Sequence, residues 1–302
     1  MITQKHTKDI SIMTSKNKIK NQLILFIGIC FLATFSIDFI IHAKGGLEKA
    51  NLVPLQMLMP ALAAITVLLI TGQKPVFKNL GFKIPKLKHW LTGTLLILIC
   101  VLLSYFISAL FIPDLFIDAK QINGHILKSG LPVKTDNISI NIFTLFALNI
   151  LVVPIVNLPI FLGEEAGWRA FMMPRLLQIT RKYAFIIGGV IWSVWHWPII
   201  AMGHNYPGYP IIGNLLFILF CIPTGYILYF FYKKSGSVFV PALMHGVLNK
   251  ATMTMLVYCV DEKKIQPLLF GAAGVTGIII FSIAALMLYT IDKKSKYRQL
   301  VH

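Results

Sequence analysis

Eight uninterrupted apolar blocks, each about 20 residues long, constrain the fold of this chain more than any other feature. A helix of about 20 residues spans the roughly 30 Å hydrocarbon core of a bilayer. In lipid a helix satisfies its own backbone hydrogen bonds, whereas an open strand does not. We therefore predict an all-α polytopic membrane protein with about eight transmembrane helices. The blocks are 22–41, 52–71, 90–112, 141–162, 183–201, 211–232, 238–259 and 267–291.

The composition favours the same fold class. Of 302 residues, 57% are hydrophobic and 13% are charged, against about 25% charged in ordinary soluble domains. A soluble fold of this size has too few polar residues here to cover its surface. We expect one membrane domain over 21–292, with a motif-bearing core at 141–255. It lies between a Lys-rich cytoplasmic tail, 1–20, and a basic cytoplasmic tail, 293–302.

The net charge of +17 reflects topology in this interpretation. The two tails and the segments 72–89, 163–182 and 233–236 carry 20 Lys and Arg, whereas the loops between them carry 7. Because cytoplasmic loops of membrane proteins are enriched in Lys and Arg, both termini are expected in the cytoplasm, at the plasma membrane. The basic residues are scattered over short loops and form no continuous face, which argues against nucleic-acid binding. The sequence does not predict an oligomeric state.

Two adjacent carboxylates begin the segment 163–182, in the run GEEAGWRAFMMPRL. Neighbours on a helix point about 100° apart, so Glu164 and Glu165 cannot share one role. Glu165 and Arg169 have the spacing and order of a favourable helical ion pair. Glu165 and Arg169 are therefore expected to support the site, and Glu164 is free to react. The segment itself is expected to be an amphipathic helix.

Two further apolar blocks each carry a histidine. An ionisable group inside a membrane helix is costly, so its presence suggests a functional role. His196 lies among tryptophans in GGVIWSVWHWP, which is also typical of an aromatic belt at a membrane surface. His245 and Asn249 lie four residues apart in VPALMHGVLNK and so project from one helix face. The same arrangement is typical of polar residues that form a hydrogen bond between packed membrane helices. Together with Glu164, these residues suggest one polar site built from three helices.

Such a site has what amide hydrolysis requires. A carboxylate or an imidazole can deprotonate water, and a second polar group can stabilise the oxyanion as it forms. Water must reach the residues, so we expect an intramembrane cavity, open to the cytoplasm. By the block boundaries Glu164 lies at the inner edge of the membrane, so the fourth helix has to extend deeper than its apolar run.

These motifs resemble the three signature motifs of the CPBP family, which comprises CAAX proteases and bacteriocin-processing or immunity proteins. The resemblance covers about residues 141–255 and rests on Glu164-Glu165-x-x-Trp168-Arg169, the histidine at 196, and His245-x-x-x-Asn249. Two positions depart from the family pattern. Trp192 stands where a phenylalanine is usual, and Ala170 stands where a glycine often follows the arginine.

The resemblance implies an intramembrane endopeptidase that cleaves membrane-associated peptides or proteins. Glu164 and His196 would activate water, and His245 and Asn249 would bind the oxyanion. The family has also been described as metal-dependent, and the ligands would then be Glu164, His196 and His245. No HExxH is present to supply the usual zinc pair, so a metal-free mechanism is expected, with zinc as the alternative.

Two readings from other classes compete with a protease. A non-catalytic immunity-type protein could retain the family fold without chemistry. A proton-coupled transporter could use buried Glu and His as a relay, but it would need inverted repeats or paired broken helices, and we find neither in the sequence.

Overall fold

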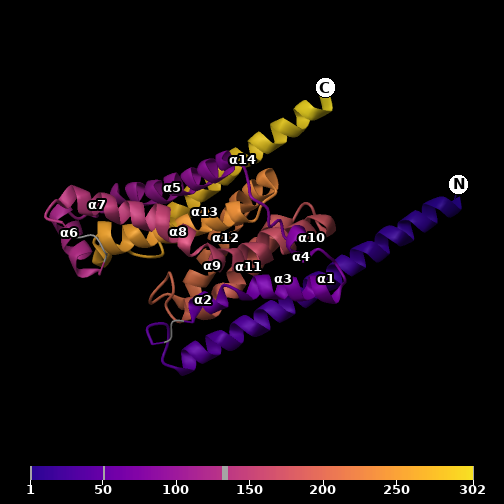
Figure 1. Ribbon diagram of the computed structural model, residues 1–302, viewed down its shortest axis with the longest axis horizontal. Coiled ribbons are helices and arrows are strands. Elements are labelled where there is room, and N and C mark those ends of the chain that lie inside the picture. Colours follow the sequence, from indigo (N-terminus) through magenta and orange to yellow (C-terminus); the bar gives the residue numbers. More distant parts are fainter. Residues whose placement is uncertain (1, 50–51, 131–134, 302) are drawn as a thin grey trace.

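The computed structural model describes residues 2–49, 52–130 and 135–301, and these form helices without a strand (Figure 1). The all-α prediction is confirmed. The α-helices are α1 Ile2–Ala43, α2 Val53–Gln56, α3 Met59–Ile70, α4 Val76–Asn79, α5 Leu87–Ala109, α6 Ala119–Lys128, α7 Ile138–Phe146, α8 Val153–Val156, α9 Leu158–Glu165, α10 Met173–Ile179, α11 Ala184–Ala201, α12 Pro210–Ser235, α13 Phe239–Thr254 and α14 Val275–Val301. Four short helices complete the chain: η1 Ala147–Val152, η2 Ala166–Met172, η3 Met255–Cys259 and η4 Glu262–Lys264.

Seven helical segments within the described residues are long and apolar enough to cross a membrane. They are Lys16–Ala43, Val53–Ile70, Leu87–Ala109, Ile138–Val156, Ala184–Ala201, Pro210–Ser235 and Val275–Lys293. Each coincides with one of the predicted apolar blocks. The chain is therefore a multi-pass membrane protein.

The remaining predicted block, 238–259, forms α13 and η3. Helix α13 has 16 residues, and most of them are buried among the other helices. It packs against α5, α8, α9 and α12. Because its neighbours shield it from lipid, α13 can carry the polar residues His245 and Asn249 at membrane depth.

The fourth predicted block extends further than its apolar run. Helical structure continues with few interruptions from residue 138 to 179 and includes two π-helical turns, η1 and η2. Pro154 and Pro159 begin new helical pieces within it, as expected where proline removes a backbone donor. The prediction that 163–182 is an amphipathic segment beyond the span is wrong for its first half. Residues 163–173 are all buried, because α3 covers α9 and η2, and α1 and α11 cover α10.

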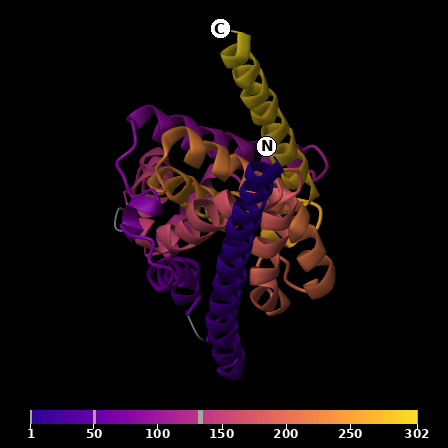
Figure 2. The same cartoon turned by 90° about the vertical axis from the view of Figure 1, so that its right-hand side faces the viewer.

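Both termini extend from one end of the helical body (Figures 1 and 2). At that end the side chain of Arg175 on α10 donates two hydrogen bonds. One goes to Oε1 of Gln22 on α1 over 3.0 Å, and the other to Oε1 of Gln73 before α4 over 3.1 Å. We call this the terminal end. The opposite, loop end carries α6 and the C-terminus of α1 (Figure 1). There the Tyr206 hydroxyl donates to the carbonyl of Ala273 over 2.6 Å.

The close packing of η2 against α3 gives a test of the fold. A Cβ at Gly167 would lie 2.7 Å from the backbone carbonyl carbon and oxygen of Pro60, too close to accommodate. We expect Gly167→Ala to destabilise the protein by about 1–3 kcal/mol, as overpacking does. The measurement is the midpoint of unfolding in detergent.

Gly28→Ala is the matched control, because a Cβ there meets nothing within 4 Å. It should leave stability unchanged or raise it by up to about 1 kcal/mol, the helix preference of Ala over Gly. Equal midpoints for the two variants would contradict the packing described for Gly167.

Candidate active site

Two glycines let the carboxylate-bearing helix approach α2 and α3. A side chain at Gly163 would collide with the backbone of Met57 and Leu58, and one at Gly167 with that of Pro60. The close approach places Glu164 and Glu165 in the interior, with 1% and 0% of their surfaces exposed. The glycines of the motif therefore set the depth of both acids.

Glu164 is held by two indole groups. Its Oε2 accepts hydrogen bonds from Nε1 of Trp192 over 2.9 Å and of Trp168 over 3.3 Å. Trp168 lies one turn further along the same helical segment, and Trp192 lies on α11. Donors that point at a carboxylate stabilise its ionised form in a dry environment. The contacts also fix the orientation of the Glu164 side chain.

Glu165 lies between two basic groups. Its Oε1 is 2.9 Å from Nδ1 of His245, and its Oε2 is 3.1 Å from Nε of Arg169. The Arg169 contact lacks the angles of a hydrogen bond, so it is mainly electrostatic. The guanidinium carbon of Arg169 also lies 4.0 Å from the centre of the Trp192 ring, a cation–π distance. Glu165 and Arg169 thus form the ion pair that their spacing of four residues predicts.

Both imidazoles use Nδ1 to bind the protein. Nδ1 of His196 lies 2.9 Å from the carbonyl oxygen of Trp192, and Nδ1 of His245 lies beside Glu165. A carbonyl and a carboxylate oxygen accept, so each Nδ1 carries the proton. This tautomer leaves Nε2 of His196 with a lone pair for a proton. The ring of His196 is also held between Trp195 and Phe217, at centroid distances of 4.6 and 4.9 Å.

One cavity of about 180 Å³ joins the candidate residues. Glu164, His196, His245 and Asn249 all line it, and a space of this size holds several water molecules. The structure thus brings together all four residues to which catalytic roles were assigned, while Glu165 and Arg169 lie behind them. The other lining residues are Val53, Gln56, Met57, Trp192, Trp195, Ile199, His204, Asn205, Phe217, Phe220, Leu248, Thr252, Met253, Ala272 and Ala273.

Several residues of the site were missed by sequence reasoning. Trp192 was noted only as a departure from the family pattern and within the aromatic-belt alternative, although its indole N–H bonds Glu164 and its carbonyl bonds His196. Trp168 could have been found, because it stands four residues after Glu164. Gln56 lines the cavity with its amide buried and without a hydrogen-bond partner among the described residues. No sequence pattern connects Gln56 with the three motifs, because only tertiary packing brings it there.

His204 is a further histidine on the cavity, in the loop between α11 and α12. Burial lowers the pKa of its imidazole from the ordinary value. The ring is therefore neutral near pH 7 and adds no full charge to the cavity. Asp38, on α1, does not line the cavity, and within the described chain its two oxygens have no hydrogen-bond partner.

The donor set does not fit a metal ion as it is arranged. Among the described residues, no three His, Cys, Asp or Glu side chains are grouped so that they could hold one. Of the ligands that zinc would require, Glu164 already receives two N–H donors on Oε2. N–H groups on a carboxylate oxygen compete with a cation for the same lone pairs. We therefore derive no step through a metal.

Comparison with known proteins gives two similarities. Residues 139–251 match a family described as type II CAAX prenyl endopeptidase Rce1-like. A curated relative, CAAX prenyl protease 2 of Methanococcus maripaludis, is 29% identical over 143 residues, which are 45% of this chain and 48% of the relative. The alignment thus spans about half of each protein. The matched region contains all the residues of the three motifs.

The buried ion pair should be important for stability. Glu165→Gln leaves the guanidinium of Arg169 buried without its counter-charge, and breaking a buried pair in this way costs about 3–5 kcal/mol. Unfolding in detergent measures the loss. The control is Lys233→Gln, which breaks the exposed pair of Lys233 with Asp292 at 3.4 Å. It should change stability by at most about 1 kcal/mol. Similar losses in both variants would show that burial does not decide the effect.

Proposed function

We propose that this chain, whose residues 139–251 match the Rce1-like type II CAAX prenyl endopeptidase family, is an intramembrane endopeptidase. The observation that carries the proposal is that one cavity is lined by Glu164, His196, His245 and Asn249. A carboxylate, two imidazoles and an amide meet there among apolar helices. That set supplies both a base for water and donors for an oxyanion.

In the first step, a water molecule between Glu164 and His196 attacks the scissile carbonyl carbon. Nε2 of His196 can take a proton because Nδ1 is committed to the carbonyl of Trp192. Glu164 orients the same water through its carboxylate, which the indoles hold in place. A base within reach of the water contributes about 10²–10⁴ in rate.

His245 and Asn249 stabilise the negative charge that develops on the carbonyl oxygen, because both can donate hydrogen bonds to it. The Glu165 carboxylate stabilises a positive charge on the His245 ring, so that Nε2–H can donate while Nδ1–H stays on Glu165. Asn249 projects one turn further along α13 and offers its amide N–H. The intermediate collapses when the C–N bond breaks and the proton taken from water passes to the leaving amine.

The substrate class that we propose is a membrane-associated peptide or protein. The cavity is also lined by apolar and aromatic side chains, which suit a chain segment near lipid. The name of the Methanococcus relative refers to a CAAX prenyl substrate, so a prenylated CAAX peptide is the first to assay beside its unprenylated form. We place the protein in the plasma membrane, with both termini in the cytoplasm.

Replacing the water-orienting acid tests the chemistry. Glu164→Gln keeps the shape of the side chain and removes its charge, so cleavage should fall by at least about 10²-fold. Mass spectrometry of peptides incubated with the purified variant measures the rate. A non-catalytic immunity-type protein would instead function normally with Gln at this position. Undiminished cleavage would contradict the role of Glu164.

The oxyanion role of Asn249 has a neighbouring control. Asn249→Ala should lower the cleavage rate by about 10²–10³-fold, the cost of one lost oxyanion donor. Lys250→Gln changes the adjacent residue, which does not line the cavity, and should cleave at nearly the wild-type rate. Equal losses in the two variants would contradict the assignment of Asn249.

The metal-free mechanism predicts resistance to chelators. Incubation with 1,10-phenanthroline should leave the cleavage rate of the purified protein unchanged, because no step uses a metal. Loss of activity that added zinc restores would instead support the alternative, with Glu164, His196 and His245 as ligands. Metal content of the active protein, measured by mass spectrometry, is the independent check.

A further inference from the structure

The two ends of the helical body differ in charge. The terminal end carries the two tails and the segments 72–89, 174–182 and 233–236, which hold 19 of the 28 Lys and Arg. The loop end comprises the segments 42–51, 113–140, 202–210 and 260–266, which hold 7 Lys and Arg and six carboxylates. Since cytoplasmic loops are the ones enriched in Lys and Arg, the loop end faces away from the cytoplasm.

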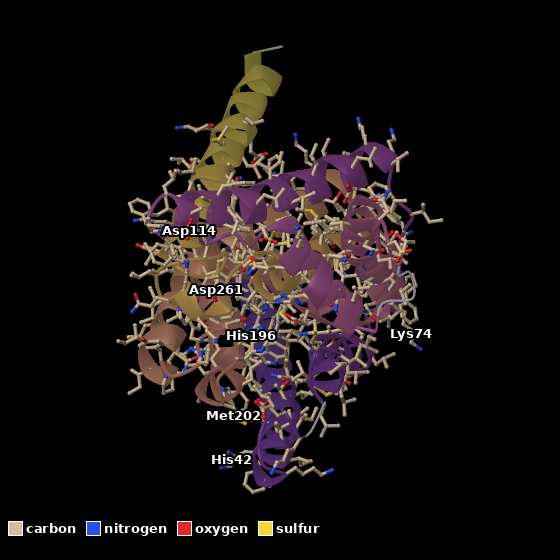
Figure 3. The ribbon with its side chains drawn as sticks, turned by 90° about the vertical axis from the view of Figure 1, so that its left-hand side faces the viewer. His42, Lys74, Asp114, His196, Met202 and Asp261 are labelled. Carbon is tan, nitrogen blue, oxygen red and sulfur yellow. The ribbon has the colours of Figure 1, made fainter. Side chains whose placement is uncertain are left out.

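The loops of that end belong together in space. Nζ of Lys264 donates to the carbonyls of Pro113 and Asp114 over 3.2 and 3.1 Å. The Tyr206 hydroxyl reaches Ala273 from the loop between α11 and α12. Figure 3 looks onto this end and labels His42 in the last turn of α1, Met202 after α11, Asp114 and Asp261 in loops, and His196.

The cavity lies on the same side. On α11 the lining residues run from Trp192 to Ile199, in the half of the helix nearer the loop end. On α12 they are Phe217 and Phe220, again in the half nearer that end. The lining also includes His204 and Asn205 in the connecting loop. Apart from Glu164, none of its lining residues comes from the basic segments 1–20, 72–89, 163–182 or 233–236. Two lining residues are exposed, Asn205 in this loop and Met253 near the end of α13. We take Asn205 as the position of the mouth, because it lies in the loop at that end.

From these two placements we propose that the cavity opens at the non-cytoplasmic face and receives the outer part of a membrane-anchored polypeptide. The inference rests on the proposed function for the cleavage itself. It replaces the expectation of a cytoplasmic opening, which was drawn from the position of Glu164 relative to its apolar run. The bond that is cut lies where the substrate chain leaves the bilayer on the outside.

The mouth indicates the chemistry of that segment. The loop 202–210 has no Lys, Arg, Asp or Glu, and the nearby lining residues Val53, Met57 and Met253 are apolar. A charged peptide would lose hydration here without gaining a partner. An uncharged, apolar stretch close to the lipid surface would fit without that penalty.

Cysteine labelling in intact cells tests the orientation. The four native cysteines are buried, so the wild-type chain is the blank for a membrane-impermeant maleimide. Asn205→Cys at the mouth and Lys120→Cys on α6 should be labelled from outside. Lys78→Cys on α4, at the terminal end, should be labelled only after the membrane is opened. Lys120→Cys reports the same end if the mouth variant fails to accumulate.

Labelling of Lys78→Cys but not of Lys120→Cys and Asn205→Cys in intact cells would overturn the proposal, and so would equal labelling of both ends. Labelling requires no catalysis, so this result is separate from the test of Glu164. If the orientation holds while Glu164→Gln still cleaves, the proposed function fails and the orientation stands.

A second arm tests access through the mouth. External maleimide on Asn205→Cys should abolish cleavage of an anchored substrate, because the adduct lies in the path to the cavity. The same reagent on Lys120→Cys should label without loss, since Lys120 does not line the cavity. Full cleavage by labelled Asn205→Cys would contradict entry at this point.

Discussion

The carboxylate of Glu165 connects two helices that are 80 residues apart in the sequence. A buried carboxylate is costly unless it is paired. Here Arg169 provides the opposite charge, and Nδ1–H of His245 donates a hydrogen bond. The requirement to pair fixes α9 and η2 against α13, and it sets the tautomer of His245. The position of His245 therefore depends on a residue that does not itself line the cavity.

Trp192 makes the corresponding connection to α11. Its indole N–H donates a hydrogen bond to Glu164, and its carbonyl oxygen accepts one from Nδ1–H of His196. Its ring lies against the guanidinium of Arg169. One residue thus orients Glu164, His196 and the ion pair of Arg169 with Glu165. An aromatic ring without an N–H would keep the packing but lose the bond to Glu164, which is why the tryptophan at this position matters chemically.

The sequence predicted what local patterns determine. Apolar runs gave the membrane helices, and spacings of four residues gave the Glu165–Arg169 pair and the common face of His245 and Asn249. The depth of Glu164 could not be read in this way, because hydropathy treats its motif as the end of a span. Two π-helical turns and two close-packed glycines carry that motif into the interior. The place of Gln56 in the cavity wall follows only from tertiary packing.

The central claim is that Glu164, His196, His245 and Asn249 act on one carbonyl group. The most direct measurement is an experimental structure of the protein in lipid with a bound peptide ketone, whose hydrate imitates the tetrahedral intermediate. One hydroxyl of the hydrate should lie within hydrogen-bond distance of Glu164 and Nε2 of His196, and the other within reach of His245 and Asn249. A hydrate bound elsewhere, or in contact with one of these pairs alone, would contradict the account.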